Sequence, residues 1–213
     1  MVNIGIIGAT GYVGIEIIRL LQNHPEVNIS TVVSQSFAGQ KISDVYPSLR
    51  NIFDMECQNL DIDKVAECSD IVITALPHGV SSHVVPEFLK RGKRVIDHSG
   101  DFRYKSAEVY EKWYKIKHNA PELLKDAVYG LPELYRDKIK DAAIVANPGC
   151  YPTCSILGLA PLLSNKLIDT KNIIIDAASG VTGAGRKSEL AYQFCECTEN
   201  FKAYGVTTHR HTS

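Results

Sequence analysis

The chain lacks the features that mark membrane and nucleic-acid-binding proteins. No apolar run approaches the roughly 20 residues that a transmembrane helix needs. Charge of one sign is not in excess, because 23 Lys and Arg against 24 Asp and Glu give a formal net charge of -1. We therefore expect neither nucleic acid nor a membrane as a partner, since both are usually bound through a basic stripe. A 45% hydrophobic composition argues against disorder.

Two further absences concern location and metal. The N-terminal MVNIGIIGAT enters an apolar strand pattern without the charged segment and cleavage site of a signal peptide, which predicts a cytoplasmic, reducing location. The chain has 6 cysteines, but its 213 residues can bury a core without disulfides. No second Cys/His pair at zinc-finger spacing accompanies Cys195 and Cys197, so no metal site is predicted.

Short apolar runs and amphipathic segments alternate along the first part of the chain. The predicted strands are Val2–Gly8, Asn28–Val33, Asp70–Leu76, Arg94–Asp97, Ala142–Ala146 and Lys171–Ala178; the predicted helices include Gly11–Asn23, Ser81–Lys90 and Glu108–Lys117, and Tyr129–Tyr135 is predicted to be a turn-rich loop. This alternation is typical of the α/β class, a parallel sheet with helices on both faces. We expect one domain over residues 1–146 and a second over 147–213.

The loop GATGYVG follows the first predicted strand and opens the first predicted helix. Gly8 permits a tight turn, Gly11 lets the backbone approach a pyrophosphate, and Gly14 allows close packing of helix on strand. Unpaired N–H groups at the helix start then face the anion. The strand, turn and helix context predicts dinucleotide binding, with contacts from Gly8, Thr10, Gly11, Tyr12, Val13 and Gly14, and from Pro77 in the loop after the third strand.

A carboxylate that would hold the ribose 2′-hydroxyl of NAD(H) is missing. Such a residue usually lies about 20 positions beyond the glycine loop, which in this chain is near Ser34. The segment SQSFAGQK that begins there carries hydroxyls and a lysine but no carboxylate. Because a carboxylate would repel a 2′-phosphate and hydroxyls suit one, the sequence predicts NADP(H), with Ser34 and Ser36 as contacts.

Cys150 is the candidate nucleophile. It lies between a predicted strand end and a predicted helix start, where the positive end of the helix dipole favours a thiolate. Pro152 suits the first helical turn, and Gly149 leaves room for a substrate. The other interpretation is a buried structural cysteine, which fits Cys154 better, and also Cys57 and Cys68.

A cysteine nucleophile needs a base, and two histidines near the end of the chain are candidates. His209 and His211 lie in THRHT, and position alone does not decide between them. His78 and His98 follow predicted strands, at the sheet edge where α/β proteins place their ligand-contacting loops.

Seven motifs together resemble the N-acetyl-gamma-glutamyl-phosphate reductase family: GATGYVG, ALPHG, DHSGDFR, YGLPELYR, NPGCYPT, SGVTGAGR and HRHT. The resemblance implies a Rossmann-type parallel-sheet domain followed by an α+β substrate domain. It also implies NADPH-dependent reduction of N-acetyl-L-glutamyl 5-phosphate to the 5-semialdehyde, with release of phosphate, in arginine biosynthesis. A small-molecule acyl phosphate is then the substrate, and a homo-oligomer is expected at full length.

The resemblance assigns roles to individual residues. Cys150 matches the nucleophile, and His209 matches the base that takes the thiol proton and later protonates the collapsing intermediate. Gly183 belongs to a glycine-rich segment expected near the nicotinamide. Arg103 resembles the phosphate-contacting arginine of aspartate-semialdehyde dehydrogenases. Arg186 or Arg210 is expected to hold a carboxylate, and Asn147 completes the predicted substrate contacts.

Members of the family continue past the HRHT motif, whereas this chain ends at Ser213. We therefore expect a truncated chain with an incomplete substrate domain that exposes apolar surface. Two related enzymes remain alternatives: aspartate-semialdehyde dehydrogenase, which the GCYPT and YGLPELYR segments disfavour, and the lysine-pathway homologue that acts on a carrier-linked substrate. A catalytically inactive NADP-binding fragment is an alternative of a different class.

Overall fold

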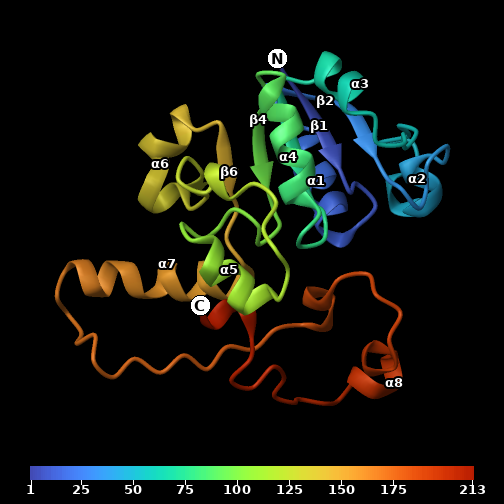
Figure 1. Ribbon diagram of the computed structural model, residues 1–213. Helices are drawn as coiled ribbons and strands as arrows, with labels where there is room; N and C mark the ends of the chain where they lie inside the picture. Colours follow the sequence, from blue (N-terminus) through green and yellow to red (C-terminus); the bar gives the residue numbers. More distant parts are fainter.

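A single parallel sheet organises the first 146 residues of the computed structural model, which describes all residues from 1 to 213. Its strand order is β2-β1-β3-β4-β6-β5, and every pairing is parallel. Figure 1 labels β2, β1, β4 and β6 of this sheet. The strands are β1 (Val2–Ile7), β2 (Val27–Val33), β3 (Ile71–Thr74), β4 (Arg94–Asp97), β5 (Val128–Tyr129) and β6 (Ile144–Ala146). The predicted α/β class is confirmed.

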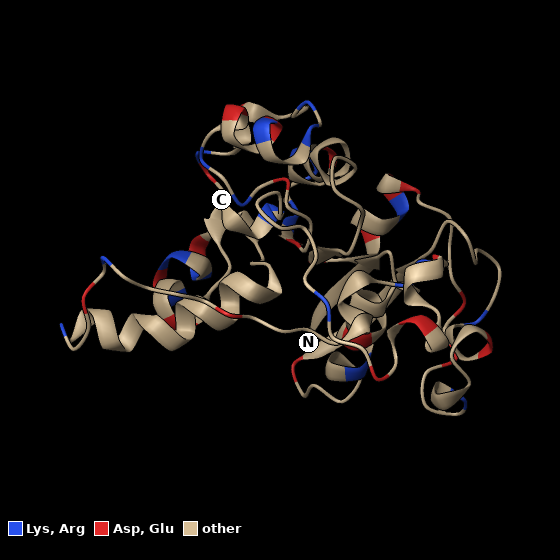
Figure 2. Cartoon of the chain, turned by 90° about the horizontal axis from the view of Figure 1, so that it is seen from below, with Lys and Arg blue, Asp and Glu red and all other residues tan.

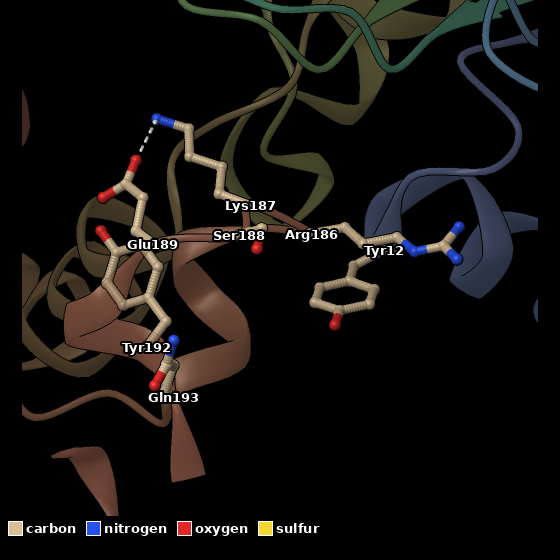
Figure 3. A pocket seen from close by; sticks show the side chains of 7 residues that line it. All are labelled: Tyr12, Arg186, Lys187, Ser188, Glu189, Tyr192 and Gln193. Atoms are coloured by element: carbon tan, nitrogen blue, oxygen red, sulfur yellow. Dashed lines mark ion pairs between the residues drawn. The ribbon is translucent and has the colours of Figure 1, made fainter. Parts of the chain in front are cut away.

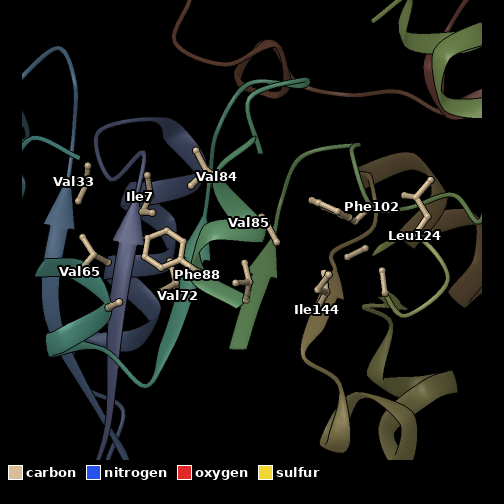
Figure 4. Close-up of a cluster of buried hydrophobic side chains, with 14 residues drawn as sticks. Ile7, Val33, Val65, Val72, Val84, Val85, Phe88, Phe102, Leu124 and Ile144 are labelled. Atoms are coloured by element: carbon tan, nitrogen blue, oxygen red, sulfur yellow. The ribbon is translucent and has the colours of Figure 1, made fainter. Parts of the chain in front are cut away.

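The strands are nearly continuous apolar runs because both faces of the sheet are covered. Successive side chains of a strand point to opposite faces, so Ile6 and Ile7 enter different cores. Ile6 joins a cluster of 11 buried residues packed by α1 (Tyr12–Leu21), and Ile7 joins a cluster of 14 packed by α4 (Ser81–Lys90). Figure 4 shows the larger cluster, in which the ring of Phe88 from α4 packs over the sheet.

Shorter elements connect the strands and extend the chain beyond them. The remaining α-helices are α2 (Ile42–Val45), α3 (Ile62–Cys68), α5 (Ala107–Tyr114), α6 (Pro132–Asp141), α7 (Cys150–Ser164) and α8 (Phe194–Cys197). Single 3-10 turns lie at Pro47–Leu49, Pro121–Leu123, Val181–Ala184, Leu190–Tyr192 and Arg210–Thr212. The C-terminus returns to lie beside α5 and the start of α7 (Figure 1).

The predicted loop over Tyr129–Tyr135 is wrong. Tyr129 ends β5 and pairs with Ala146 of β6, and α6 begins three residues later at Pro132. Proline suits a helix start because its fixed φ is already helical and its missing N–H has no partner there. The turn residues of this segment therefore mark a strand-to-helix junction.

The predicted strand over Lys171–Ala178 is also wrong. This segment pairs with no strand, and Ile174 is 93% exposed. An extended apolar run becomes a strand only where a neighbouring strand pairs with its backbone groups, and no strand lies beside this one. No residue after Gly149 is buried, so the exposed apolar surface expected for residues 147–213 is present.

Charged residues are distributed along the whole chain. Figure 2 shows positive and negative positions interspersed on helices and loops. This arrangement agrees with the near-zero net charge of -1. None of the helices has the length and apolar character that would let it cross a membrane.

Candidate active site

The glycine loop forms the turn between β1 and α1. Gly8 has φ +86°, and a Cβ on it would lie 2.3 Å from the Ala75 carbonyl oxygen. A Cβ on Gly14 would lie 2.4 Å from the Gly8 carbonyl oxygen. Neither position tolerates a side chain, because backbone atoms occupy that space. The start of α1 has no side-chain cap, so this cradle of backbone atoms fits the phosphates of a dinucleotide.

The end of β2 lies against the glycine loop. Thr10 and Ser34 are both buried, and their hydroxyl oxygens are 2.7 Å apart. Ser36 is exposed, as are Tyr12 and Val13 at the start of α1. The structure therefore brings together the predicted cofactor residues of the glycine loop and of the β2 end. The Ser34 hydroxyl is hydrogen-bonded to Thr10. The Ser36 hydroxyl is exposed and can bind a ligand.

A second cluster forms where the central strands end. Arg103 donates from Nε to the Asn147 carbonyl oxygen (2.7 Å) and from Nη2 to that of His98 (3.0 Å). The Asn147 amide donates to His98 Nδ1 (3.2 Å). Burial, with the nearby Arg103 charge, lowers the pKa of His98 to about 4. Arg103 and Asn147 were predicted on separate motifs, and the structure joins them three residues before the candidate nucleophile, Cys150.

Cys150 is the first residue of α7 and is exposed. The extended Gly149 precedes it as N-cap, with φ -71° and ψ 159°. Cys57 is buried as expected, but Cys68 and Cys154 are exposed, contrary to the prediction that they are buried structural residues. For Cys154 the reason is that α7 has no buried residue, so no element covers its outer face.

Both candidate bases lie beside the start of α7. His211 packs on Gly149, where a Cβ would lie 2.4 Å from its Nε2. His209 contacts the ring of Tyr151, with ring centroids 5.4 Å apart, and its Nδ1 accepts a hydrogen bond from the His211 N–H (3.1 Å). Burial, with the neighbouring His209, lowers the pKa of His211 to about 4.

The remaining predicted residues lie further from this cluster or at its rim. The Arg210 guanidinium lies over the Tyr114 ring at 5.2 Å, near the end of α5. Pro77 and Gly183 are exposed. Arg186 lies at the glycine loop, where its Nη1 donates to the Thr10 carbonyl oxygen (3.3 Å). The structure therefore brings Arg186 to the cofactor residues.

Sequence reasoning missed Asp101, a buried carboxylate that ties three segments together. Its oxygens accept from the N–H groups of Gly79 (2.8 Å) and Ser82 (2.9 Å) and from the Tyr110 hydroxyl (2.8 Å). His118, also buried, contacts the Asp101 carbonyl oxygen at 2.8 Å. Asp101 lies in the motif DHSGDFR. Its hydrogen-bond partners lie in other segments of the chain, and the spacing of apolar residues does not predict which segments those are.

The domain descriptions that match the sequence agree with this architecture. "Semialdehyde dehydrogenase, NAD binding domain" matches residues 3–142, and "Semialdehyde dehydrogenase, dimerisation domain" matches residues 150–213. The chain therefore belongs to the semialdehyde dehydrogenase family.

Its relatives include N-acetyl-gamma-glutamyl-phosphate reductases, which confirms the resemblance drawn from the seven motifs. That of Acetivibrio thermocellus is 68% identical over 213 residues, which are 100% of this chain and 62% of that protein. That of Desulforamulus reducens is 53% identical over 212 residues, 100% of this chain and 61% of that protein. The chain thus spans less than two thirds of the length of these relatives.

Solved structures show the same fold. Aspartate semialdehyde dehydrogenase with NADP from Candida albicans has a TM-score of 0.61 at 20% identity, covering 78% of this chain and 47% of that chain. Aspartate semialdehyde dehydrogenase II from Vibrio cholerae, in complex with ASA, has a TM-score of 0.57 at 21% identity, covering 77% and 47%.

Proposed function

We propose that this chain serves the NADPH-dependent reductive dephosphorylation of N-acetyl-L-glutamyl 5-phosphate to its 5-semialdehyde, within a cytoplasmic homo-oligomer that acts in arginine biosynthesis. The observation that carries the proposal is the exposed Cys150 thiol at the start of α7, three residues after the Asn147 that Arg103 holds. The names of the relatives supply the substrate class.

NADP(H) is the cofactor we propose. The glycine cradle at Gly8 and Gly14 fits its phosphates, since a Cβ at either position would meet backbone atoms within 2.4 Å. The exposed hydroxyl of Ser36 and the lack of a carboxylate in SQSFAGQK favour a 2′-phosphate. A bound nicotinamide supplies one hydride to the acyl carbon of the substrate.

Cys150 performs covalent catalysis in this proposal. Its sulfur attacks the acyl carbon, the bond from that carbon to the phosphate oxygen breaks, and inorganic phosphate leaves. The product is a thioester on Cys150. After the acyl carbon has been reduced, its bond to sulfur breaks, which releases the aldehyde and returns the sulfur as the leaving group.

His209 and the polar cluster move and hold charge around that sulfur. His209 accepts the thiol proton as the sulfur attacks and returns it as the carbon–sulfur bond breaks. The fixed guanidinium of Arg103, held by two backbone carbonyls, attracts the substrate phosphate. Asn147 orients His98 and remains a proposed substrate contact.

Trapping the thioester tests the proposal. The chain is incubated with N-acetylglutamyl phosphate, and with aspartyl phosphate as the competing substrate, and the mass of the peptide that contains residue 150 is measured. We expect an adduct from the N-acetylglutamyl compound that NADPH then removes. The C150S variant forms no thioester, whereas C154S, which alters another exposed cysteine of α7, behaves like the parent chain.

An inactive NADP-binding module is the second candidate. The observation that favours it is the absence of any buried residue beyond Gly149, which leaves the nucleophile segment with little tertiary support. That candidate predicts tight NADPH binding with no adduct at Cys150. An adduct that forms but resists NADPH would contradict the proposed reduction while preserving the nucleophile.

A further inference from the structure

Arg186 brings a positive charge from the distant SGVTGAGR segment to the glycine loop. Its Nη1 donates to the Thr10 carbonyl oxygen at 3.3 Å, although 176 positions separate the two residues. The centre of its guanidinium lies 5.1 Å from the rings of both Phe37 and Tyr46. In Figure 3 its side chain extends away from Lys187 toward Tyr12 and the start of α1.

The charge of this arginine has no acidic partner. The ion pairs of the chain do not include Arg186, whereas its neighbour Lys187 pairs with Glu189 at 3.8 Å. Aromatic contacts fix the plane of a guanidinium without neutralising it. A guanidinium has five N–H donors, and the hydrogen bond to Thr10 uses one of them, so donors remain for an anion.

The surroundings match the site of a ribose phosphate. The Tyr46 hydroxyl donates to the same Thr10 carbonyl oxygen (2.9 Å), and the Thr10 side chain contacts Ser34. Phe37, which lies under the guanidinium, belongs to the segment SQSFAGQK at the end of β2. In dinucleotide-binding folds, residues at the end of this strand contact the 2′ position of the adenosine ribose, and an arginine there accommodates a 2′-phosphate.

We propose that Arg186 is the cation that selects the 2′-phosphate of NADP(H). This inference rests on the proposed cofactor and goes beyond it, because the selecting residue lies in the region that follows α7 and not in the sheet domain. Cofactor selection and the packing of this region onto the glycine loop then depend on the same side chain. Lys187, one position further along, has no role in it.

Cofactor titration tests the inference without any turnover. The dissociation constants of NADPH and NADH are measured by fluorescence for the parent chain and for R186Q, R186K and K187Q. Loss of a charge-assisted contact weakens NADPH binding roughly 10- to 100-fold in R186Q, while NADH binding stays within about twofold. R186K retains part of the preference, and K187Q equals the parent chain.

Each other outcome overturns the inference in a recognisable way. If R186Q binds NADPH as the parent chain does, another group holds the 2′-phosphate. Equal weakening of NADPH and NADH makes Arg186 a structural clamp with no part in selection. A parent chain that binds neither cofactor refutes the proposed function itself, and the inference with it. Because Arg186 is exposed, R186Q is expected to fold, which circular dichroism checks.

Discussion

The two parts of this chain differ in burial far more than in composition. Every buried residue except Gly149 lies within residues 1–146, and no residue after Gly149 is buried. The first part holds all six strands, and the second has two helices and three short 3-10 turns joined by extended chain. Apolar residues are common in both, so their abundance does not explain the difference.

Two similar apolar runs show what does explain it. In the run DIVITAL, Val72 is 0% exposed because β3 pairs with β1 on one side and β4 on the other. In the run KNIIIDAA, Ile174 is 93% exposed and no strand pairs with it. A strand is stable only where neighbouring strands satisfy its backbone and a covered face buries its side chains. Whether an apolar run becomes a strand therefore depends on the strands and helices that lie beside it.

The second part touches the first through a few polar and aromatic contacts. Arg186 reaches the Thr10 carbonyl oxygen, and the Tyr104 hydroxyl donates to that of Arg210 (3.4 Å). The Arg210 guanidinium lies over the Tyr114 ring at 5.2 Å. The two parts therefore meet at the proposed cofactor loop and beside α5.

The largest expected effect comes from matched phenylalanine substitutions. Phe88 is 0% exposed and lies in the larger core, whereas Phe201 is 83% exposed. F88A should lower the free energy of unfolding by about 3–5 kcal/mol, through lost burial and the cavity left behind. F201A should change it by less than about 0.5 kcal/mol. Urea unfolding measures both, and a similar loss in the two variants would contradict the division into two parts.

A smaller effect is expected from adding one methyl group to a glycine in each part. In G14A the new Cβ would lie 2.4 Å from the Gly8 carbonyl oxygen, so the backbone must shift. We expect a loss of about 1–3 kcal/mol in stability together with the loss of NADPH binding. In G180A the nearest atom is 4.0 Å away, and both properties should stay unchanged. Retained NADPH binding in G14A would refute the proposed cradle.

The smallest effect concerns two histidines whose pKa is lowered to about 4 by burial, one in each part: His98 and His211. A depressed folded-state pKa favours the neutral ring, so its stabilisation is complete above the unfolded value of about 6.5 and is lost as pH falls toward 4. H98Q should therefore flatten the decline in unfolding free energy over this range. H211Q should leave this decline unchanged, because residues 147–213 are expected to unfold locally before the sheet domain unfolds. Equal slopes for H98Q and the parent chain would contradict this.

Most strands and the glycine loop of residues 1–146 were predictable, because each is encoded by residues close together in the sequence. The glycine loop needs Gly8 at positive φ and Gly14 against backbone, and both requirements appear in the sequence as spacing. The strand ends carrying His78 and His98 followed from the parallel sheet. Asp101 was not predictable, since its hydrogen-bond donors come from two other segments: Gly79 and Ser82 at the start of α4, and Tyr110 on α5.

In the candidate site, too, contacts between distant segments could not be predicted from the sequence. Cys150 was identified from its place before a helix, and the structure places its side chain in the exposed position that nucleophilic attack requires. The exposure of Cys154 was not anticipated, because helical position alone does not reveal which face of α7 is covered. Arg186 or Arg210 was expected to hold a substrate carboxylate, and that role stays a prediction. The packing of the Arg186 guanidinium beside Phe37 and Tyr46 was not anticipated.

The sequence by itself determined the α/β class, the glycine turn and the position of the candidate nucleophile. Each depends on residues close together along the chain, where backbone sterics and the spacing of apolar residues act directly. Tertiary structure alone decided which apolar runs became strands, which hydroxyls stayed free and where Arg186 and Asp101 placed their charges. Those outcomes depend on contacts between segments far apart in sequence, and only the folded chain brings such segments together.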